Sequence, residues 1–229
     1  MQQPYDPATT SFDAAAARRL REALGMTPAH VAHGMWAAYG LRVAPATVAS
    51  WELGEAEPGE AELPALAGAL WCAPADLLGT PSSLRQYRLA RGMAVSDLAL
   101  LVGMQPEEYV QMERDGEWRG DDRQAAALGG ALELPPDVLL ELTGRADRLA
   151  ELLRSAVTTR WQAYTGPVAD LVAFPRRRLE TVLRALHADY RSAAAGSLNW
   201  GGAGSSATAQ AAAEEFLAGI VDRFWARAR

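Results

Sequence analysis

The sequence contains an internal repeat. Residues 18–32 read RRLREALGMTPAHVA and residues 85–99 read RQYRLARGMAVSDLA, so that arginines, a Gly-Met pair and an alanine recur in register. The stretches 65–78 and 127–140 match in the same way. A unit that recurs at a fixed period is one supersecondary structure used more than once. We therefore expect a flexible N-terminus followed by two related domains and a distinct last region, at 1–12, 13–80, 81–144 and 145–229.

The two copies differ in length at one place. The offset between matching residues is 67 at Ala32 and Ala99 but 61 at Glu52 and Glu113, so the first copy carries six extra residues between Ala32 and Glu52. The extra residues lengthen either a helix or the turn after it. Three large side chains fall here at helical spacing, which favours core or inter-domain packing over a ligand pocket; they are Met35, Trp36 and Tyr39.

Each copy is predicted to consist of short helices. Asp13 can cap a helix that buries Leu20 and Leu24 and stops at Gly25. Thr27-Pro28 begins a second helix, since threonine caps and proline is tolerated at the first helical position. Further helices are expected after a stop near Gly40, at 44–53, 60–70 and 74–78. In the second copy the expected apolar anchors are Leu84, Leu98, Leu101, Tyr109, Met112, Leu128, Leu132 and Leu139.

The last region carries longer apolar patterns. Large residues recur every three to four positions in three stretches, which predicts three amphipathic helices. The first is expected to break at Thr165-Gly166-Pro167, and the second to begin after Pro175. Residues 192–209 are rich in Gly and Ser, so we expect a loop there, anchored by Trp200. No stretch alternates with the period of a β-strand, so the predicted fold class is all-α.

Charge is distributed unevenly along the chain. All 22 basic residues are arginines, and the whole chain has a net charge of −6. Residues 1–80 and 81–144 are acidic, whereas 145–229 holds 12 arginines against 8 acids. Charge alone would therefore place a contact with a polyanion in the last third. Without a long apolar run or a secretion signal, and with Cys72 as its single cysteine, the chain is expected to be cytoplasmic, with no contact to membranes.

The repeated motif resembles a known DNA-binding fold. The second copy reads LRQYRLARGMAVSDLALLVGMQPEEYVQMERDG, and the first reads RRLREALGMTPAHVA followed by VAPATVASWELG. Both are similar to the Cro/C1-type helix-turn-helix of the xenobiotic-response-element family of bacterial and phage regulators. The resemblance implies two tandem lambda-repressor-like domains that bind double-stranded DNA. It also implies that the protein is a homodimer and is associated with the nucleoid. It also implies structural ion pairs that tie the first helix to the recognition helix, namely Arg21 with Glu52 and Arg88 with Glu113.

The same resemblance places the reading face of the first copy. Its recognition helix would present Pro45, Ala46, Thr47, Ala49 and Ser50 to the major groove. Since this set holds no Arg, Asn or Gln, sequence reading would rest on the Thr47 and Ser50 hydroxyls, on apolar contact and on DNA shape. Phosphate contacts are expected from Arg18, Arg19, His30 and Arg42, with solvated side chains as the alternative.

The second copy departs from this pattern. Its matching positions are Pro106, Glu107, Glu108, Val110 and Gln111. Carboxylates aimed at phosphates repel them, so we interpret this copy as degenerate, serving as a protein-facing module or a spacer.

The remaining features are open to more than one interpretation. Arg176, Arg177 and Arg178 form the densest basic cluster, which would contact phosphates or an acidic partner, or be solvated. The C-terminal helices would dimerise or bind a partner. His30 and His33 are spaced as metal ligands but lack further ligands nearby, and no nucleophile has an assignable base, so we expect no metal, no cofactor and no enzyme activity. The sequence thus favours a DNA-binding transcriptional regulator; the alternative is a protein-interaction adaptor built on degenerate helix-turn-helix domains.

Overall fold

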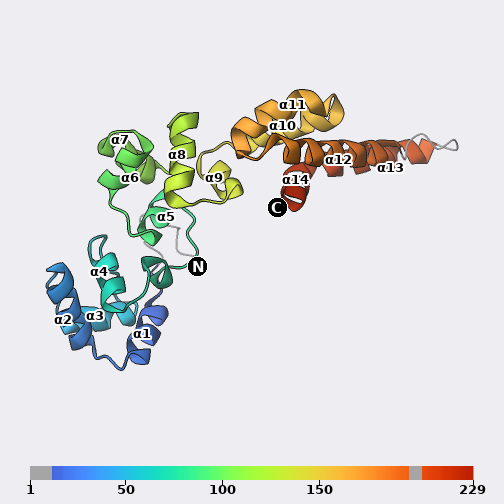
Figure 1. The fold of residues 1–229 in the computed structure, drawn as a ribbon. Coiled ribbons are helices and arrows are strands. Elements are labelled where there is room, and N and C mark those ends of the chain that lie inside the picture. The colour runs from blue at the N-terminus through green and yellow to red at the C-terminus, as the bar shows by residue number, and fades with distance from the viewer. Residues whose placement is uncertain (1–11, 196–202, 229) are drawn as a thin grey trace. The chain divides into compact units, whose positions relative to one another are not determined.

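The computed structural model describes residues 12–195 and 203–228, and these residues are folded into helices (Figure 1). The one β feature among them is an isolated antiparallel bridge between Phe12 and Leu78. The predicted all-α class is therefore confirmed. The chain forms two compact units, residues 1–134 and 135–229, which are described separately below.

The first unit contains eight α-helices and a short 3-10 helix within its described residues. They are α1 (Ala14–Ala23), α2 (Pro28–Tyr39), α3 (Pro45–Glu52), α4 (Glu62–Ala69), η1 (Pro74–Leu77), α5 (Leu84–Ala90), α6 (Val95–Val102), α7 (Pro106–Asp115) and α8 (Asp122–Leu132). Side chains cap the helices where the sequence predicts it. Asp13 accepts a hydrogen bond from the Ala16 backbone N–H at 2.8 Å, and Thr27 accepts one from His30 at 3.3 Å.

The repeat in the sequence is also a repeat in the backbone. α1 to α4 match α5 to α8 in order, and the chain reverses at matching left-handed residues. Trp71 and Glu133, which are 62 positions apart, both have a positive φ after the fourth helix, of 57° and 51°. Side chains other than glycine rarely adopt this conformation, which among the described residues also occurs at Ala173 after α11. Its recurrence at matching positions adds to the common order of the helices.

The six extra residues of the first copy lengthen both a helix and a turn. α2 has 12 residues whereas its counterpart α6 has 8, so four of the six extend the helix by about one turn. The other two lengthen the connection to the next helix, which spans 40–44 in the first copy and 103–105 in the second. The added length brings in Trp36, Tyr39 and Arg42, none of which has an aligned counterpart in α6 or its turn.

The core of the first copy includes a helix of the second. Val31, Met35, Val48 and Trp51 are buried together with the apolar side chains of α4 and η1. Leu89 of α5 belongs to the same cluster, and η1 packs against both α1 and α5. The two copies are therefore joined through a shared apolar core within one unit.

The second unit is a helical bundle. Its helices are α9 (Pro136–Leu142), α10 (Ala146–Thr158), α11 (Trp161–Val172), α12 (Arg176–Ala195), α13 (Ala203–Ala218) and α14 (Ile220–Ala228). α10, α11, α12 and α14 bury one apolar cluster, to which α9 adds Leu140 and α13 adds Phe216. The apolar stripes predicted for this region therefore face each other. Among the described residues of this unit, no large hydrophobic side chain is strongly exposed.

Several local expectations are wrong. α11 runs through Pro167 without a break, and the chain instead interrupts the helix at Thr159 and Arg160, where Thr159 leaves the helical conformation. Residues 203–209, expected in a loop, form the start of α13, since this stretch is rich in alanine, the strongest helix former. The expected anchor Trp200 lies outside the described residues, as do residues 1–11.

Two expected core residues lie at the surface. Leu24 is 46% exposed and Leu101 is 59% exposed. Leu24 follows the last residue of α1, where the chain has already turned away from the core. In α6, Leu98, Ala99 and Val102 fill the buried positions, so Leu101 lies outside the buried face.

Candidate nucleic-acid interface

One face of α3 is buried in the core, and its other face is accessible to solvent. Val48 and Trp51 are buried against α1 and α2, whereas Pro45 and Ala46 are exposed. The other three residues predicted to read bases, Thr47, Ala49 and Ser50, are partly exposed. The first turn of α3 has no side-chain cap, since Ala44 stands at the N-cap. The predicted reading residues thus lie together on one accessible face of small side chains.

A bidentate ion pair fixes the end of α3 to α1. Arg21 Nε donates to Glu52 Oε1 at 2.7 Å, Nη2 donates to Oε2 at 2.8 Å, and Nη1 donates to the Met26 carbonyl at 2.8 Å. The hydrogen bond to Glu52 raises the pKa of Arg21. All of the donor groups facing the carboxylate are used, so the pair orients α3 and leaves no free charge for a ligand. The structural role expected for Arg21 and Glu52 agrees with this geometry.

The second copy repeats this pair and adds a third member. Arg88 Nε and Nη2 donate to the two Glu113 oxygens at 2.7 and 2.9 Å, and Nη1 donates to the Met93 carbonyl at 2.9 Å. Arg88 also forms an ion pair with Glu60, which lies in the first copy before α4. Burial alone would lower the pKa of Arg88, but the hydrogen bonds and charges of Glu113 and Glu60 outweigh it and raise that pKa.

The lengthened turn of the first copy carries an aromatic and cationic group. The guanidinium of Arg42 lies over the Trp36 ring, 5.8 Å from its centroid, and the His33 ring packs against the same indole with centroids 5.6 Å apart. Trp36 is 45% exposed, so the group stands at the surface beside the start of α3. Arg42 is therefore oriented by Trp36, as a cation stacked on an aromatic face.

The other residues predicted to contact phosphates differ in whether their side chains already have a partner in the chain. Arg18 forms an exposed ion pair with Glu22 at 2.9 Å, and the hydrogen bond from Arg18 lowers the pKa of that carboxyl. Arg19 is exposed and has no ion pair within the described residues. His30 closes the capping box of α2, because its Nδ1 accepts from the Thr27 backbone N–H at 3.2 Å. Of the three, Arg19 alone is fully available to a ligand.

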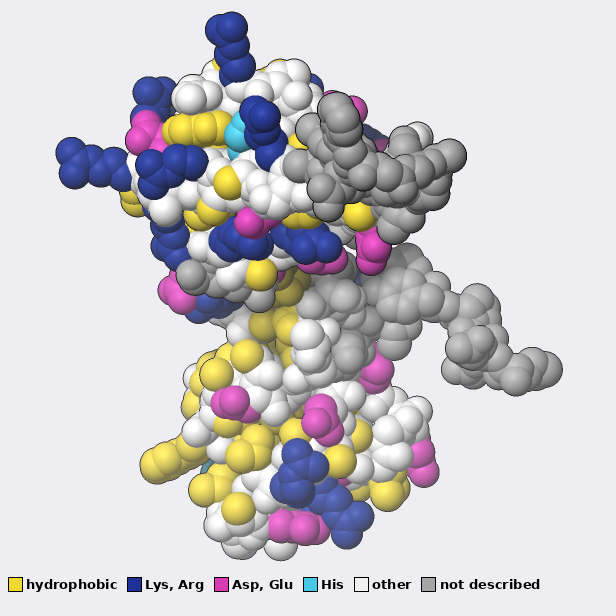
Figure 2. Space-filling view, turned by 90° about the vertical axis from the view of Figure 1, so that its right-hand side faces the viewer, with side chains coloured by type: hydrophobic (Ala, Val, Ile, Leu, Met, Phe, Trp, Pro, Cys, Tyr) yellow, Lys and Arg dark blue, Asp and Glu magenta, His cyan; other side chains and the backbone are white. Residues whose placement is uncertain are grey.

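One carboxylate stands close to the reading face. The Ser50 hydroxyl donates to Glu55 at 3.3 Å, and Glu55 is exposed. A base edge that bound Ser50 would have to replace this contact. The accessible side chains of α3 are apolar or carry hydroxyls, and none of them is basic. Figure 2 shows hydrophobic side chains widespread on the side of the first copy that faces the viewer there.

The corresponding face of the second copy is acidic and carries exposed leucines. Glu107 and Glu108 are both exposed on the first turn of α7. Leu100 and Leu101 on α6 are 80% and 59% exposed. Sequence reasoning missed the leucines, because a run of apolar residues does not show which of them face the core.

The basic cluster at the start of α12 lies in the second unit. Arg176, Arg177 and Arg178 are all exposed, and the Arg178 guanidinium packs over the Phe174 ring at 4.9 Å. Sequence reasoning stopped at these three residues and overlooked Arg184 and Arg191, which are also exposed further along the helix. Their spacing of seven residues was the available signal.

Metal binding, membrane insertion and cysteine chemistry have little support in the described residues. Among the described residues, no group of three or more His, Cys, Asp or Glu side chains could hold a metal ion. Likewise, no described helix combines the length and the apolar character needed to cross a bilayer. Burial raises the pKa of the Cys72 thiol to about 11, so it is a poor nucleophile near neutral pH.

Comparisons with protein-family models, with curated proteins and with solved structures found no match for this chain.

Proposed function

We propose that the chain is a DNA-binding transcriptional regulator, in which α2 and α3 act as a helix-turn-helix and α3 enters the major groove. The observation that carries this proposal is the face of α3. It is accessible, it is built of small side chains that allow close approach to base edges, and it is held at a fixed angle by the Arg21–Glu52 pair.

Base reading would come from short contacts. The Thr47 hydroxyl and the Ala46 methyl suit a hydroxyl-to-base hydrogen bond and an apolar contact with a thymine methyl. Arg42 and Arg19 would bind phosphates beside the groove, with Arg42 oriented by Trp36. Because residues 1–80 carry 4 arginines against 9 acids, the electrostatic contribution of this copy to affinity would be small.

The second copy would not enter a groove. Glu107 and Glu108 occupy the first turn of α7, where phosphates would approach, and no arginine of α6 or α7 offsets them except Arg114 near the end of α7. The copy would instead support the first, through Arg88 and Glu60. A homodimer remains part of the proposal, since regulators of the resembled type bind paired half-sites.

The experiment is selection of bound duplexes from a random-sequence pool, followed by fluorescence anisotropy on the enriched site. Ser50→Glu is compared with Gln111→Glu, the matching position of the second copy. Ser50→Glu should abolish specific binding, because a carboxylate would face the groove, whereas Gln111→Glu should bind like the wild type. Circular dichroism would check that both variants fold. Unchanged binding by Ser50→Glu, or no enriched sequence at all, would refute the proposal.

A protein-interaction adaptor is the second candidate. The observation that favours it is the set of large apolar side chains exposed on the first unit, which includes Trp36, Leu53, Trp71 and Leu100. Exposed apolar surface of this kind marks protein contacts more often than DNA contacts. The same selection experiment separates the two, since an adaptor would enrich no duplex.

A further inference from the structure

A line of arginines runs along α12, on the side turned away from the core. Arg177, Arg184 and Arg191 are exposed and follow one another at intervals of seven residues. Seven residues are close to two helical turns, so the three side chains share one face. The buried residues of α12 lie on the opposite face, and they are Leu179, Val182, Leu183 and Leu186. We call the three arginines the α12 stripe.

The α12 stripe has no neutralising partners. None of its arginines forms an ion pair within the described residues, whereas Arg148 and Arg227 of the same unit pair with Glu151 and Asp189. Glu180 lies on the same face, between Arg177 and Arg184, and no ion pair joins it to either within the described residues. Arg176 and Arg178 extend the positive surface at the start of the helix. Three arginines and one carboxylate leave this face with a net positive charge that an anion can neutralise.

We infer that the α12 stripe is a second, sequence-independent contact for the phosphate backbone of double-stranded DNA. The inference rests on the proposed function, and it adds a part of the molecule that lies outside both repeated copies. Successive arginines are about 10 Å apart along the helix, and the stripe covers about 20 Å. A duplex carries one charge per about 1.7 Å of its axis, so this length faces a continuous row of phosphates. Guanidinium groups bind phosphate oxygens through two parallel hydrogen bonds.

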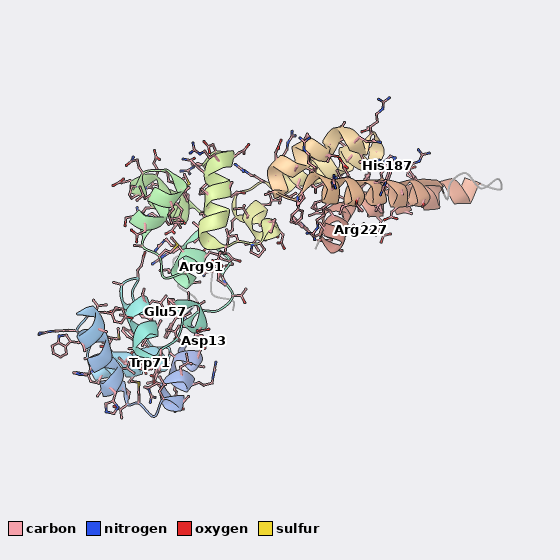
Figure 3. The ribbon with its side chains drawn as sticks, viewed as in Figure 1. Asp13, Glu57, Trp71, Arg91, His187 and Arg227 are labelled. Carbon is pink, nitrogen blue, oxygen red and sulfur yellow. The ribbon has the colours of Figure 1, made fainter. Side chains whose placement is uncertain are left out.

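The surroundings of the stripe favour DNA over a membrane. A helix that lies on a bilayer inserts large apolar side chains beside its basic ones. The apolar residues of α12 are buried in the unit, and the strongly exposed large hydrophobics of the described residues all belong to the first unit. Figure 2 shows arginine side chains projecting outward from the second unit, with patches of hydrophobic side chains between them that do not project. His187, on the flank of α12, does not add to this surface, because its Nδ1 lies 2.8 Å from the Val157 carbonyl (Figure 3).

The inference assigns different roles in DNA binding to the first copy and to the second unit. The first copy would choose the sequence with few charges, and the second unit would supply most of the salt-dependent affinity. This agrees with the distribution of charge, since residues 145–229 hold 12 of the 22 arginines. It also accounts for how an acidic chain, with a net charge of −6, would hold a polyanion.

The test is the affinity of the full chain for a 30-base-pair duplex of mixed sequence, measured by anisotropy from 50 to 200 mM salt. The stripe variant Arg177→Gln/Arg184→Gln/Arg191→Gln is compared with a control that also loses three charges, Arg91→Gln/Arg119→Gln/Arg148→Gln. The control arginines are already paired, with Glu133, Asp115 and Glu151. In a plot of the logarithm of the association constant against the logarithm of the salt concentration, the slope is negative. Its magnitude should be smaller by about 3 for the stripe variant than for the wild type, and smaller by less than about 1 for the control.

The outcomes separate the inference from the proposed function. Equal affinity and slope in the wild type and the stripe variant would overturn the inference alone, provided that the wild type binds. If the stripe variant lost the binding to anionic lipid vesicles that the wild type shows, but bound DNA as the wild type does, the inference would also be overturned. A wild-type chain that binds no duplex at 50 mM salt would overturn both. If Ser50→Glu loses selection of the enriched site but keeps affinity for the mixed duplex, while the stripe variant does the reverse, both are supported.

Discussion

The two copies of the repeat keep the same internal frame and differ on their surfaces. Arg21–Glu52 and Arg88–Glu113 have the same three hydrogen bonds, to within about 0.1 Å. Their exposed helices have little in common, since α3 presents small side chains and α7 presents Glu107 and Glu108. The two copies therefore share the ion pair that joins their first and third helices, and they differ in the residues that could contact a ligand.

The frame itself is not quite equal in the two copies. The Arg88 side chain is fully buried and shared between Glu113 and Glu60, whereas that of Arg21 is 12% exposed and bound to Glu52, with Glu22 at 3.7 Å. Glu60 comes from the first copy, so this difference exists only because the copies are joined. The following predictions test how far the two copies depend on each other.

The largest effect is expected for Arg88→Gln. The substitution leaves Glu113 and Glu60 without a buried cation, which should cost about 3–5 kcal/mol in the free energy of unfolding of the first unit. Arg21→Gln, at the more accessible site, should cost about 1–3 kcal/mol. Urea unfolding followed by tryptophan fluorescence measures both.

Glu60→Gln is the control for this comparison. It keeps the Arg88–Glu113 pair and removes the contact of Glu60 with Arg88, together with its longer contact with Arg85 at 3.7 Å. If the contact between the copies causes the difference, Arg88→Gln should cost less in the Glu60→Gln background than in the wild type. Equal losses for Arg21→Gln and Arg88→Gln in the wild type would mean that the contact contributes nothing.

Local signals in the sequence predicted much of this frame. Asp13 and Thr27 cap their helices because a short polar side chain can accept from the first free N–H groups, which is a property of a few adjacent residues. The Arg–Glu pairs came from the resemblance, and the fixed spacing in both copies made them recognisable. Thr47 and Ser50 were placed on the accessible side of α3 for the same reason, although their contact with DNA remains a prediction.

Long-range contacts were the part that the sequence could not predict. Glu60 has no position in the repeated motif, and its approach to Arg88 depends on how η1 and α5 pack. Leu101 continues an apolar run and is exposed only because Leu98 and Val102 occupy the core side of α6. Arg184 and Arg191 are a different case, since their seven-residue spacing after Arg177 in the helix predicted to begin after Pro175 was visible in the sequence.

The second largest effect is expected for the reactivity of Cys72, the single cysteine. It follows the end of α4, at the position where the second copy has Leu134. Burial raises the pKa of its thiol to about 11, so at pH 8 the thiolate fraction falls by about a hundredfold relative to an unperturbed thiol. Reaction with a disulfide reagent should be slower by about that factor in the native chain than in urea. Because the pKa is raised, the native rate should keep rising up to about pH 11, whereas the rate in urea should level off near pH 9.

This reaction also reports on the first copy alone. Arg88→Gln and Glu60→Gln should each increase the native rate if the contact between the copies keeps the first copy closed. A native rate equal to that in urea would show that Cys72 is not protected, and an unchanged rate in both variants would show that the first copy closes without help from the second.

The smallest effect is expected at the matching left-handed residues Trp71 and Glu133. Trp71 is 86% exposed and has a φ of 57°, a conformation that costs a side chain other than glycine about 1 kcal/mol. Trp71→Gly should therefore stabilise the chain by up to about 1 kcal/mol. Glu133→Gly relieves the same strain but removes the ion pair with Arg91, at 2.7 Å, so its gain should be smaller. The urea midpoint of each variant measures the difference. Destabilisation by Trp71→Gly would mean that contacts of the indole with the chain itself outweigh the relief of backbone strain.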